Sequence, residues 1–212
     1  MDYLKLIRYP NLLIVILTQY AMRLGIIDPL LKAASENLPG MTFQLQLDPL
    51  HFLLLVLSTV SLTAAGYVIN DYFDTHTDFL NRPDTVLVGT SIPRRHAMTL
   101  HIILNFIGVL LGFYISFHIG FPLLGFIFLL VSGMLWFYST TYKRQFLIGN
   151  LLVALLTALV PLMVIVFELP ELNKAYGEIL LRNQTNLMFI FYWILGFAVF
   201  AFLTNLVREI VK

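Results

Sequence analysis

The sequence has 212 residues, of which 59% are hydrophobic and only 12% are charged, and its mean hydropathy is +0.85. Because soluble domains carry about 25% charged residues, this composition excludes an ordinary water-facing surface, and we expect the lipid bilayer to surround most of the chain. The absence of cysteine excludes disulfides, thiolate metal sites and cysteine nucleophiles. The formal net charge of +1 does not identify a partner, and we expect no nucleic acid to bind.

Six apolar segments follow one another along the chain, and each is long enough to cross a hydrocarbon core of about 30 Å as a helix. They are residues Leu12–Leu31, Leu50–Ile69, Ala97–Ile119, Phe121–Phe137, Phe146–Phe167 and Leu187–Val207. Spanning helices satisfy their own backbone hydrogen bonds, so the sequence predicts an all-α, polytopic transmembrane helical bundle, a single domain over residues 1–212. The longer connections, near Lys32–Pro49 and Glu168–Asn186, are interpreted as connectors.

The first apolar segment is interpreted as a retained helix, because no small-residue cleavage site follows a short apolar core. It is also the least regular of the six, since Arg23, Asp28 and Pro29 interrupt it. A charged side chain is costly inside a membrane. We therefore expect Arg23 to point outward to the membrane surface or to pair with Asp28.

Lysine and arginine are unevenly divided between the two sides of the predicted bundle. One side receives Lys32, Lys174 and Arg182, and the other receives nine residues: Lys5, Arg8, Arg82, Arg94, Arg95, Lys143, Arg144, Arg208 and Lys212. Cytoplasmic loops are enriched in these residue types. We therefore expect a multi-pass protein of the inner (cytoplasmic) membrane whose N-terminus and nine-residue side face the cytoplasm.

The most specific feature lies where the second span is predicted to leave the membrane on that side. Asp71, Asp74 and Asp78 are spaced i, i+3 and i+7, and Asn70 is four residues before Asp74. On a continuing helix these side chains share one face, where their like charges repel unless a positive group offsets them. Oxygen ligands at this spacing suit Mg²⁺, which binds one or two carboxylates together with substrate phosphates. For any single aspartate, a solvated helix end is the alternative interpretation.

Two further polar groups are predicted on the same side. After the fourth span, Lys143 and Arg144 follow several hydroxyl side chains, and this combination suits a diphosphate because arginine can bind bidentately and lysine supplies a point charge. Taken alone, the pair is better interpreted as an ordinary positive anchor. The end of the sixth span, residues Thr204–Lys212, indicates by itself only a juxtamembrane end. Acids and bases gathered on one face fit a metal-bridged diphosphate.

The acidic pattern resembles the first aspartate-rich motif of the UbiA superfamily of intramembrane prenyltransferases. The pattern is Asn70-Asp71-x-x-Asp74-x-x-x-Asp78, and the loop Asn81-Arg82-Pro83-Asp84 after it, with Gly89 and Ser91, is also similar to that family. Further similarity lies in Arg8-Tyr9-Pro10-Asn11 and in Tyr138–Arg144 with Gly149-Asn150. The resemblance implies a bundle of nine spans around a lipid-open cavity, of which six are present here. It also implies Mg²⁺-dependent transfer of a prenyl group from an allylic prenyl diphosphate to a lipophilic acceptor.

The resemblance also implies roles for individual residues. Magnesium would be held by Asn70, Asp71 and Asp74, and Asp78 would support a second metal ion or order the loop. The diphosphate would be bound by Arg82, Lys143, Arg144 and Asn11. Tyr138 would line the cavity near the reacting carbon, so the candidate catalytic residues are Asp71, Asp74 and Tyr138.

Three features depart from the family pattern. Thr85-Val86 follows Arg82-Pro83-Asp84, where the family often continues with Arg-Pro, which removes an expected diphosphate contact. Tyr138 and Lys143 are five residues apart where four are common, so Ser139 is an alternative occupant of the tyrosine position. The family also has a second aspartate-rich motif after its sixth span, and the sequence ends at Lys212, where that motif is expected. We therefore expect an N-terminal part, about two thirds, of such a protein, and leave open whether it is active alone.

The acceptor is identified only by similarity. Residues Gly66–Ile69 and the Asn-Arg-Pro-Asp loop are closest to members that act on geranylgeranylglyceryl phosphate, although branches acting on aromatic quinone precursors, haem and chlorophyll share much of this pattern. Two other classes of function stay open, a cation or lipid transporter and a non-catalytic truncated membrane paralogue. A transporter should carry ionisable residues near the bilayer midplane, whereas these acids gather at a membrane exit, which favours the enzyme.

Overall fold

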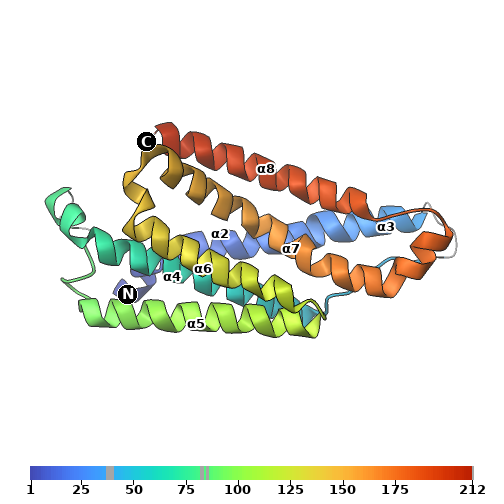
Figure 1. The fold of residues 1–212 in the computed structure, drawn as a ribbon, viewed down its shortest axis with the longest axis horizontal. Coiled ribbons are helices and arrows are strands. Elements are labelled where there is room, and N and C mark those ends of the chain that lie inside the picture. Colours follow the sequence, from blue (N-terminus) through green and yellow to red (C-terminus); the bar gives the residue numbers. More distant parts are fainter. Residues whose placement is uncertain (37–40, 82–83, 85, 212) are drawn as a thin grey trace.

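The structure is a computed structural model that describes residues 1–36, 41–81, 84 and 86–211, and the described part is an all-α bundle of long helices (Figure 1). The chain consists of α-helices joined in places by a π-helical segment or short 3-10 turns (η). In order they are α1 (Asp2–Leu6), α2 (Tyr9–Tyr20), η1 (Ala21–Ile27), α3 (Asp28–Glu36), α4 (Pro49–Asn81), α5 (Arg94–His118), η3 (Pro122–Leu124), α6 (Gly125–Thr140), η4 (Tyr142–Arg144), α7 (Phe146–Arg182) and α8 (Met188–Val211).

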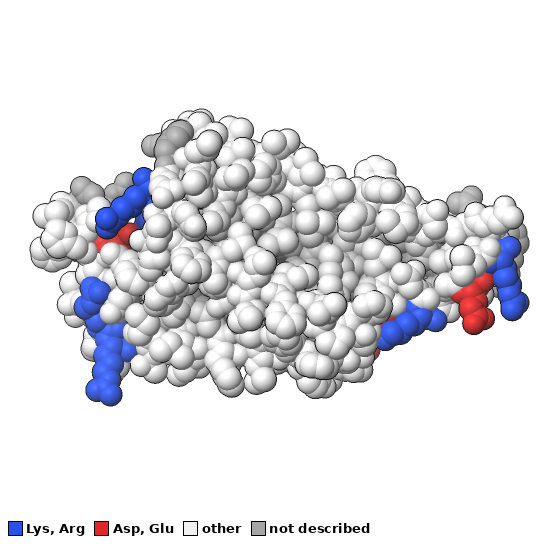
Figure 2. All heavy atoms as spheres, viewed as in Figure 1, with Lys and Arg blue, Asp and Glu red and all other residues white. Residues whose placement is uncertain are grey.

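Six helical segments of the described chain are long and apolar enough to cross a membrane, which confirms the predicted number. Both chain termini lie at one end of the bundle (Figure 1), together with the last turns of α4 and the junction of α6 and α7. We call this the motif end and the opposite end the far end. On the face drawn in Figure 2, charged side chains lie toward the two ends and a broad band between them has none, as a membrane-spanning protein requires.

The fifth span is longer than the sequence predicted. Residues Glu168–Asn186 were interpreted as a connector, but α7 continues as a helix to Arg182. Pro161 and Pro170 lie inside α7, and each removes one backbone donor without ending the helix. Such prolines are tolerated in membrane helices because neighbouring groups satisfy the freed carbonyls. The polar composition of this stretch therefore reflects the exposed end of a long helix.

Close packing of α4, α5 and α6 depends on two glycines of α5. A Cβ atom at Gly108 would lie 2.7 Å from the side chain of Leu62 on α4, and one at Gly112 would lie 2.2 Å from Phe128 on α6. Ser58 on α4 donates a hydrogen bond of 2.6 Å to the Gly108 carbonyl. Small residues let membrane helices approach and bond across their backbones, so these three helices form one tightly packed layer.

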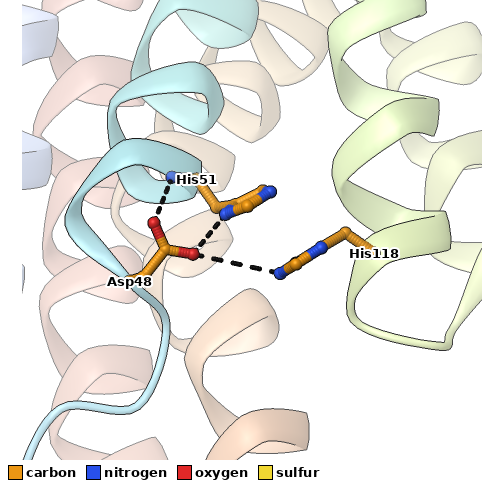
Figure 3. Close-up of side chains that lie close together, drawn as sticks. All are labelled: Asp48, His51 and His118. Atoms are coloured by element: carbon orange, nitrogen blue, oxygen red, sulfur yellow. Dashed lines mark hydrogen bonds and ion pairs between the residues drawn. The ribbon is translucent and has the colours of Figure 1, made fainter.

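The start of α4 at the far end is capped by Asp48. Its Oδ1 atom accepts hydrogen bonds from the backbone N–H groups of Leu50, at 2.9 Å, and His51, at 3.1 Å. Figure 3 draws the bond from His51. An aspartate in this position satisfies donors that a helix start leaves unpaired. The cap fixes the direction in which the extended segment 41–48 enters α4.

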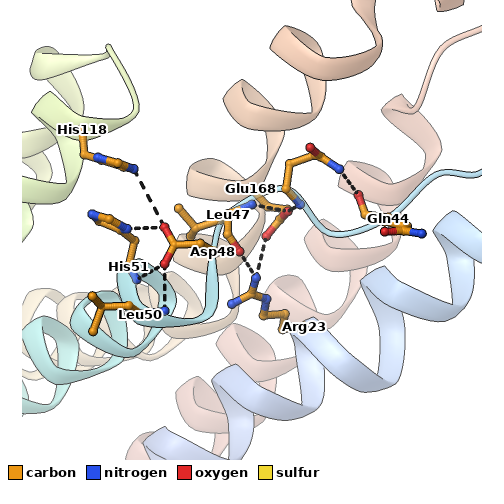
Figure 4. A network of polar contacts seen from close by, with 9 residues as sticks. Arg23, Gln44, Leu47, Asp48, Leu50, His51, His118 and Glu168 are labelled. Atoms are coloured by element: carbon orange, nitrogen blue, oxygen red, sulfur yellow. Dashed lines mark hydrogen bonds and ion pairs between the residues drawn. The ribbon is translucent and has the colours of Figure 1, made fainter.

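The expectation for Arg23 was wrong. Arg23 lies buried on the π-helical turn η1, donates a hydrogen bond to the Leu47 carbonyl, and lies 3.7 Å from Oε2 of Glu168 (Figure 4). Asp28 instead pairs with Lys32, one turn along α3, at 2.6 Å. A buried guanidinium needs a charged or polar partner close by, and Glu168, distant in sequence, provides it.

Candidate functional site

The acidic motif lies on the final turns of α4. The sequence left open whether the second span continues as a helix beyond Ile69, and α4 does continue, to Asn81. Asn70, Asp71 and Asp74 are all half-buried. Their side chains therefore lie on a face of α4 that other elements partly cover.

Asp71 is paired with Arg8, which comes from the start of the chain. Nη2 of Arg8 lies 2.8 Å from Oδ1 of Asp71, and the guanidinium also lies 4.9 Å from the centre of the Tyr67 ring. Arg8 precedes α2 and has φ 52° and ψ 54°, the left-handed region that non-glycine residues seldom adopt. This conformation turns the chain between α1 and α2 and brings a basic side chain to the acidic motif.

Asp74 is paired with Lys143. Nζ of Lys143 contacts the Asp74 carboxylate and donates a hydrogen bond of 3.0 Å to Oδ1 of Asn70. Lys143 lies on η4, the short turn between α6 and α7, and a Cβ atom at Gly149 would lie 2.7 Å from the Tyr142 carbonyl. The close approach of α7 to this turn requires glycine there, and it holds Lys143 beside α4.

A cavity of about 570 Å³ opens beside these pairs and extends into the bundle. Its charged, amide and phenolic lining lies at the motif end: Arg8, Asn11, Tyr67, Asn70, Tyr138, Asn205, Arg208 and Glu209; three threonines, Thr59, Thr63 and Thr157, line it further along α4 and α7. Deeper in, aliphatic and aromatic side chains form the wall, among them Ile14, Leu62, Phe128, Leu135, Leu156, Val160 and Met163. The combination of a charged mouth and an apolar interior suits an amphiphile with an anionic head and a hydrocarbon tail.

The predicted site residues are only partly brought together. Tyr138 and Asn11 line the cavity, and Asn11 donates a hydrogen bond of 3.2 Å to the Tyr67 hydroxyl. Asp78 is half-buried and Arg144 is exposed, and neither forms an ion pair with a described residue. Arg82 lies outside the described residues. Ser139, the alternative to Tyr138, is buried and donates to the Leu135 carbonyl of its own helix.

The sequence reasoning missed several residues of this site. Arg8 was given no role in the site and was noted only in the family-like segment Arg8–Asn11. Its position on the side with nine basic residues could have indicated that it lies near the acidic motif. Arg208 and Glu209, at the end of α8, line the cavity and form an ion pair of 3.0 Å. Asn205, one turn earlier, donates to Oγ1 of Thr157 on α7 at 3.1 Å. The end of the sixth span thus belongs to the cavity wall.

Comparison with protein families gives a match over residues 39–210 to the model described as the UbiA prenyltransferase family. Two curated relatives are digeranylgeranylglyceryl phosphate synthases. The one from Methanosphaera stadtmanae is 33% identical over 71% of this chain and 46% of its own length, and the one from Methanothermobacter thermautotrophicus is 34% identical over 76% and 49%. The chain therefore spans about half the length of the curated relatives it matches.

A solved structure described as digeranylgeranylglyceryl phosphate synthase in membranes has a similar fold. It superposes with a TM-score of 0.64 over 98% of this chain and 58% of that one, at 23% sequence identity. At this identity the likeness shows a shared fold and nothing finer.

Proposed function

Because the chain belongs to the UbiA prenyltransferase family, we propose that it transfers a prenyl group from an allylic prenyl diphosphate to a lipophilic acceptor. The observation that carries the proposal is the location of two acid–base pairs, Arg8 with Asp71 and Lys143 with Asp74, beside the mouth of an apolar cavity. The hydrocarbon tail would lie in the cavity and the diphosphate at its mouth. The bilayer would supply the acceptor.

The donor atoms at the mouth fit magnesium. Asn70, Asp71 and Asp74 offer one amide oxygen and two carboxylates, the hard oxygen ligands that Mg²⁺ takes alongside phosphate oxygens and water. Asp78, one turn further on, is a candidate for a second ion or for ordering the following loop. Bound there, Mg²⁺ would neutralise charge that develops on the departing diphosphate.

The two basic side chains, Arg8 and Lys143, can exchange their carboxylate partners for phosphate oxygens. Arg8 and Lys143 balance the charge of Asp71 and Asp74. When the carboxylates turn to a metal–diphosphate, both cations become available for phosphate oxygens, arginine bidentately and lysine as a point charge. They would stabilise the leaving group where its negative charge increases, which lowers the barrier to breaking the carbon–oxygen bond. Arg82 is proposed as a further diphosphate ligand, and exposed Arg144 is the weaker candidate.

Tyr138 and Asn11 would act on the organic part of the substrate and on its head. Tyr138 lines the cavity on α6 near the mouth, where its ring could face the allylic cation that remains when diphosphate leaves. Asn11 lies beside Tyr67 at the same level and could donate to a phosphate oxygen. Both roles need a substrate seated with its reacting carbon near the mouth.

Geranylgeranylglyceryl phosphate is the acceptor we favour. The curated relatives are named digeranylgeranylglyceryl phosphate synthase. This acceptor carries a phosphate group of its own, which would enter the site in addition to the diphosphate of the prenyl donor. Arg208, in the last turn of α8, lines the cavity and is the candidate to receive the acceptor phosphate. We further propose that the motif end faces the cytoplasm, since it carries most of the lysine and arginine.

A transfer assay tests the function directly. Purified protein in lipid is given Mg²⁺, radiolabelled geranylgeranyl diphosphate and geranylgeranylglyceryl phosphate, and the labelled diether product is extracted. We expect product from the unaltered chain and a loss of at least 100-fold in Asp71→Asn and Asp74→Asn, because each removes a charged ligand of the diphosphate-bound metal. Product formation that is unchanged by both substitutions contradicts the metal site. Metal-dependent binding of diphosphate without product supports a non-catalytic chain.

A further inference from the structure

A second cluster of ligand-type side chains lies at the far end, remote from the acidic motif. Asp48 precedes α4, His51 lies in the first turn of α4, and His118 is the last residue of α5. Oδ2 of Asp48 contacts Nδ1 of His51 and lies 3.9 Å from Nε2 of His118, and the three ligand atoms all lie within 4.8 Å of one another. Figure 3 shows both ring nitrogens directed at the same carboxylate oxygen.

The carboxylate of this cluster is oriented by the fold. Oδ1 of Asp48 is held by the two backbone N–H groups of the α4 cap, so Oδ2 is left to face the imidazoles. Partners that fix one atom of a ligand group and leave the other for the ion are typical of protein metal sites. The orientation of Asp48 therefore does not depend on the histidine side chains.

The two imidazoles also lie next to each other. The His51 and His118 rings are stacked with their centres 3.5 Å apart and their planes 9° apart, and Tyr114 stacks on His51 at 5.8 Å. His51 is only 11% exposed, and its Nε2 atom is buried without a hydrogen-bond partner among the described residues. Asp48 is thus the only hydrogen-bond partner of the His51 ring within the described part of the chain.

The donor set favours a transition metal over magnesium. Two imidazole nitrogens and one carboxylate oxygen are ligands that Zn²⁺ takes at about 2.0–2.2 Å, which places tetrahedral ligands about 3.3 Å apart. The His118–Asp48 distance of 3.9 Å is slightly longer than this. Because a bound ion lies in the plane of each imidazole that holds it, the two rings would rotate about χ2 out of their parallel stack to bind one ion. Mg²⁺ prefers an all-oxygen shell. Asp48 and His118 are about half exposed, which leaves room for a water molecule as fourth ligand.

We propose that Asp48, His51 and His118 bind one Zn²⁺ ion, or a similar divalent transition metal, that joins the beginning of α4 to the end of α5. The ion would fasten the far end of the layer that carries the acidic motif at its other end. This site is separate from the magnesium site proposed above, and neither depends on the other.

Metal content and affinity test the site. Tag-free protein in detergent is saturated with Zn²⁺, freed of excess, and analysed by inductively coupled plasma mass spectrometry, and the dissociation constant is measured by isothermal titration calorimetry. We expect one zinc per chain, and affinity at least tenfold weaker in Asp48→Asn and His118→Gln. Asparagine preserves the helix cap, so Asp48→Asn removes the ligand charge without removing the cap. His96→Gln is the matched control, because His96 is an exposed histidine at the other end of α5.

Spectroscopy and stability add readouts that unspecific binding does not give. Co²⁺ in place of zinc should produce the visible absorption of tetrahedral nitrogen and oxygen ligation in the unaltered protein and in His96→Gln, and should lose it in His118→Gln. Because a ligand that binds only the folded state stabilises it, Zn²⁺ should raise the unfolding temperature of the unaltered protein and not that of Asp48→Asn. Equal zinc content and affinity in the unaltered protein, Asp48→Asn and His118→Gln would overturn the proposal.

Discussion

Arg23 and Glu168 form a buried ion pair at the far end, with Nη2 3.7 Å from Oε2 and side chains that are 6% and 0% exposed (Figure 4). The other oxygen of Glu168 accepts hydrogen bonds from the backbone N–H groups of Gln46, at 2.5 Å, and Leu47, at 3.0 Å. Arg23 donates to the Leu47 carbonyl. One pair thus attaches the extended segment before α4 to both η1 and α7.

Removal of Glu168 should therefore be costly. Glu168→Ala leaves a buried guanidinium without its charge partner, and we expect a loss of about 3–5 kcal/mol in unfolding free energy. Glu171→Ala is the control on the same helix, because Glu171 pairs with half-exposed Lys174 and such a pair is worth at most about 1 kcal/mol. Chemical unfolding in detergent measures both. Equal stability of the two variants would show that the buried pair does not hold the segment.

Lys143 and its neighbour Arg144 should differ sharply in diphosphate binding. Both side chains are exposed, but Lys143 contacts Asp74 and Asn70, whereas Arg144 forms no ion pair with a described residue. A hydrogen bond to a charged group contributes about 1.5–3 kcal/mol, so Lys143→Met should weaken binding of geranylgeranyl diphosphate with Mg²⁺ by about 10- to 100-fold. Arg144→Met should change it less than threefold. Equilibrium binding of labelled diphosphate gives the ratio, and a larger effect at Arg144 would reverse the assignment.

Two substitutions of Arg8 should separate the cost of its backbone conformation from the effect of losing its charge. Arg8→Gly and Arg8→Ala both lose the contact to Asp71, but only glycine adopts φ 52° without strain. We expect Arg8→Gly to be more stable than Arg8→Ala by about 1 kcal/mol. Both should bind diphosphate equally weakly. Unfolding curves and binding measured on the same preparations separate the two effects, and identical stability would mean that the chain relaxes at this turn.

The depth of the cavity should set the length of prenyl chain accepted. Val160 lines the cavity ten residues beyond Asn150 at the start of α7, about 15 Å along the helix. Val160→Trp should reduce transfer from geranylgeranyl diphosphate more than transfer from geranyl diphosphate. Leu155→Trp on the outer face of α7 is the control and should leave the ratio unchanged. The measurement is the ratio of the initial transfer rates from the two diphosphates. An unaltered ratio in Val160→Trp would mean that the prenyl tail does not reach Val160.

The sequence predicted those features that depend on local pattern. Long apolar runs identified the six spans, and i, i+3, i+4 spacing identified the face shared by Asn70, Asp71 and Asp74. For Lys143, the sequence predicted only that it lies on the same side of the membrane as that face. It did not predict the direct contact with Asp74. Helix ends were less predictable. The polar residues beyond Glu168 indicate that this stretch is exposed, but they do not show where the backbone hydrogen bonds of the helix end.

The partners of charged residues were the least predictable part. Arg23 has an acidic neighbour, Asp28, at a plausible spacing, but its actual partner lies on α7 and depends on how three elements pack. Arg8 reaches Asp71 only because its own backbone adopts an uncommon conformation. Contacts of this kind depend on tertiary geometry, which single-sequence patterns do not contain.

The glycine contacts of α5 have a consequence for how a long lipid could enter and leave. Side chains of α4 and α6 pack directly against the glycine backbone of α5, so these three helices have little freedom to separate and should move as one rigid unit. The remaining cavity wall comes from α2, α7 and α8, and two prolines inside α7 each remove one of its backbone hydrogen bonds. Opening motions of the bundle should therefore be confined to α2, α7 and α8. Spin labels on α2 and α8 should give wider distance distributions than a pair on α4 and α5.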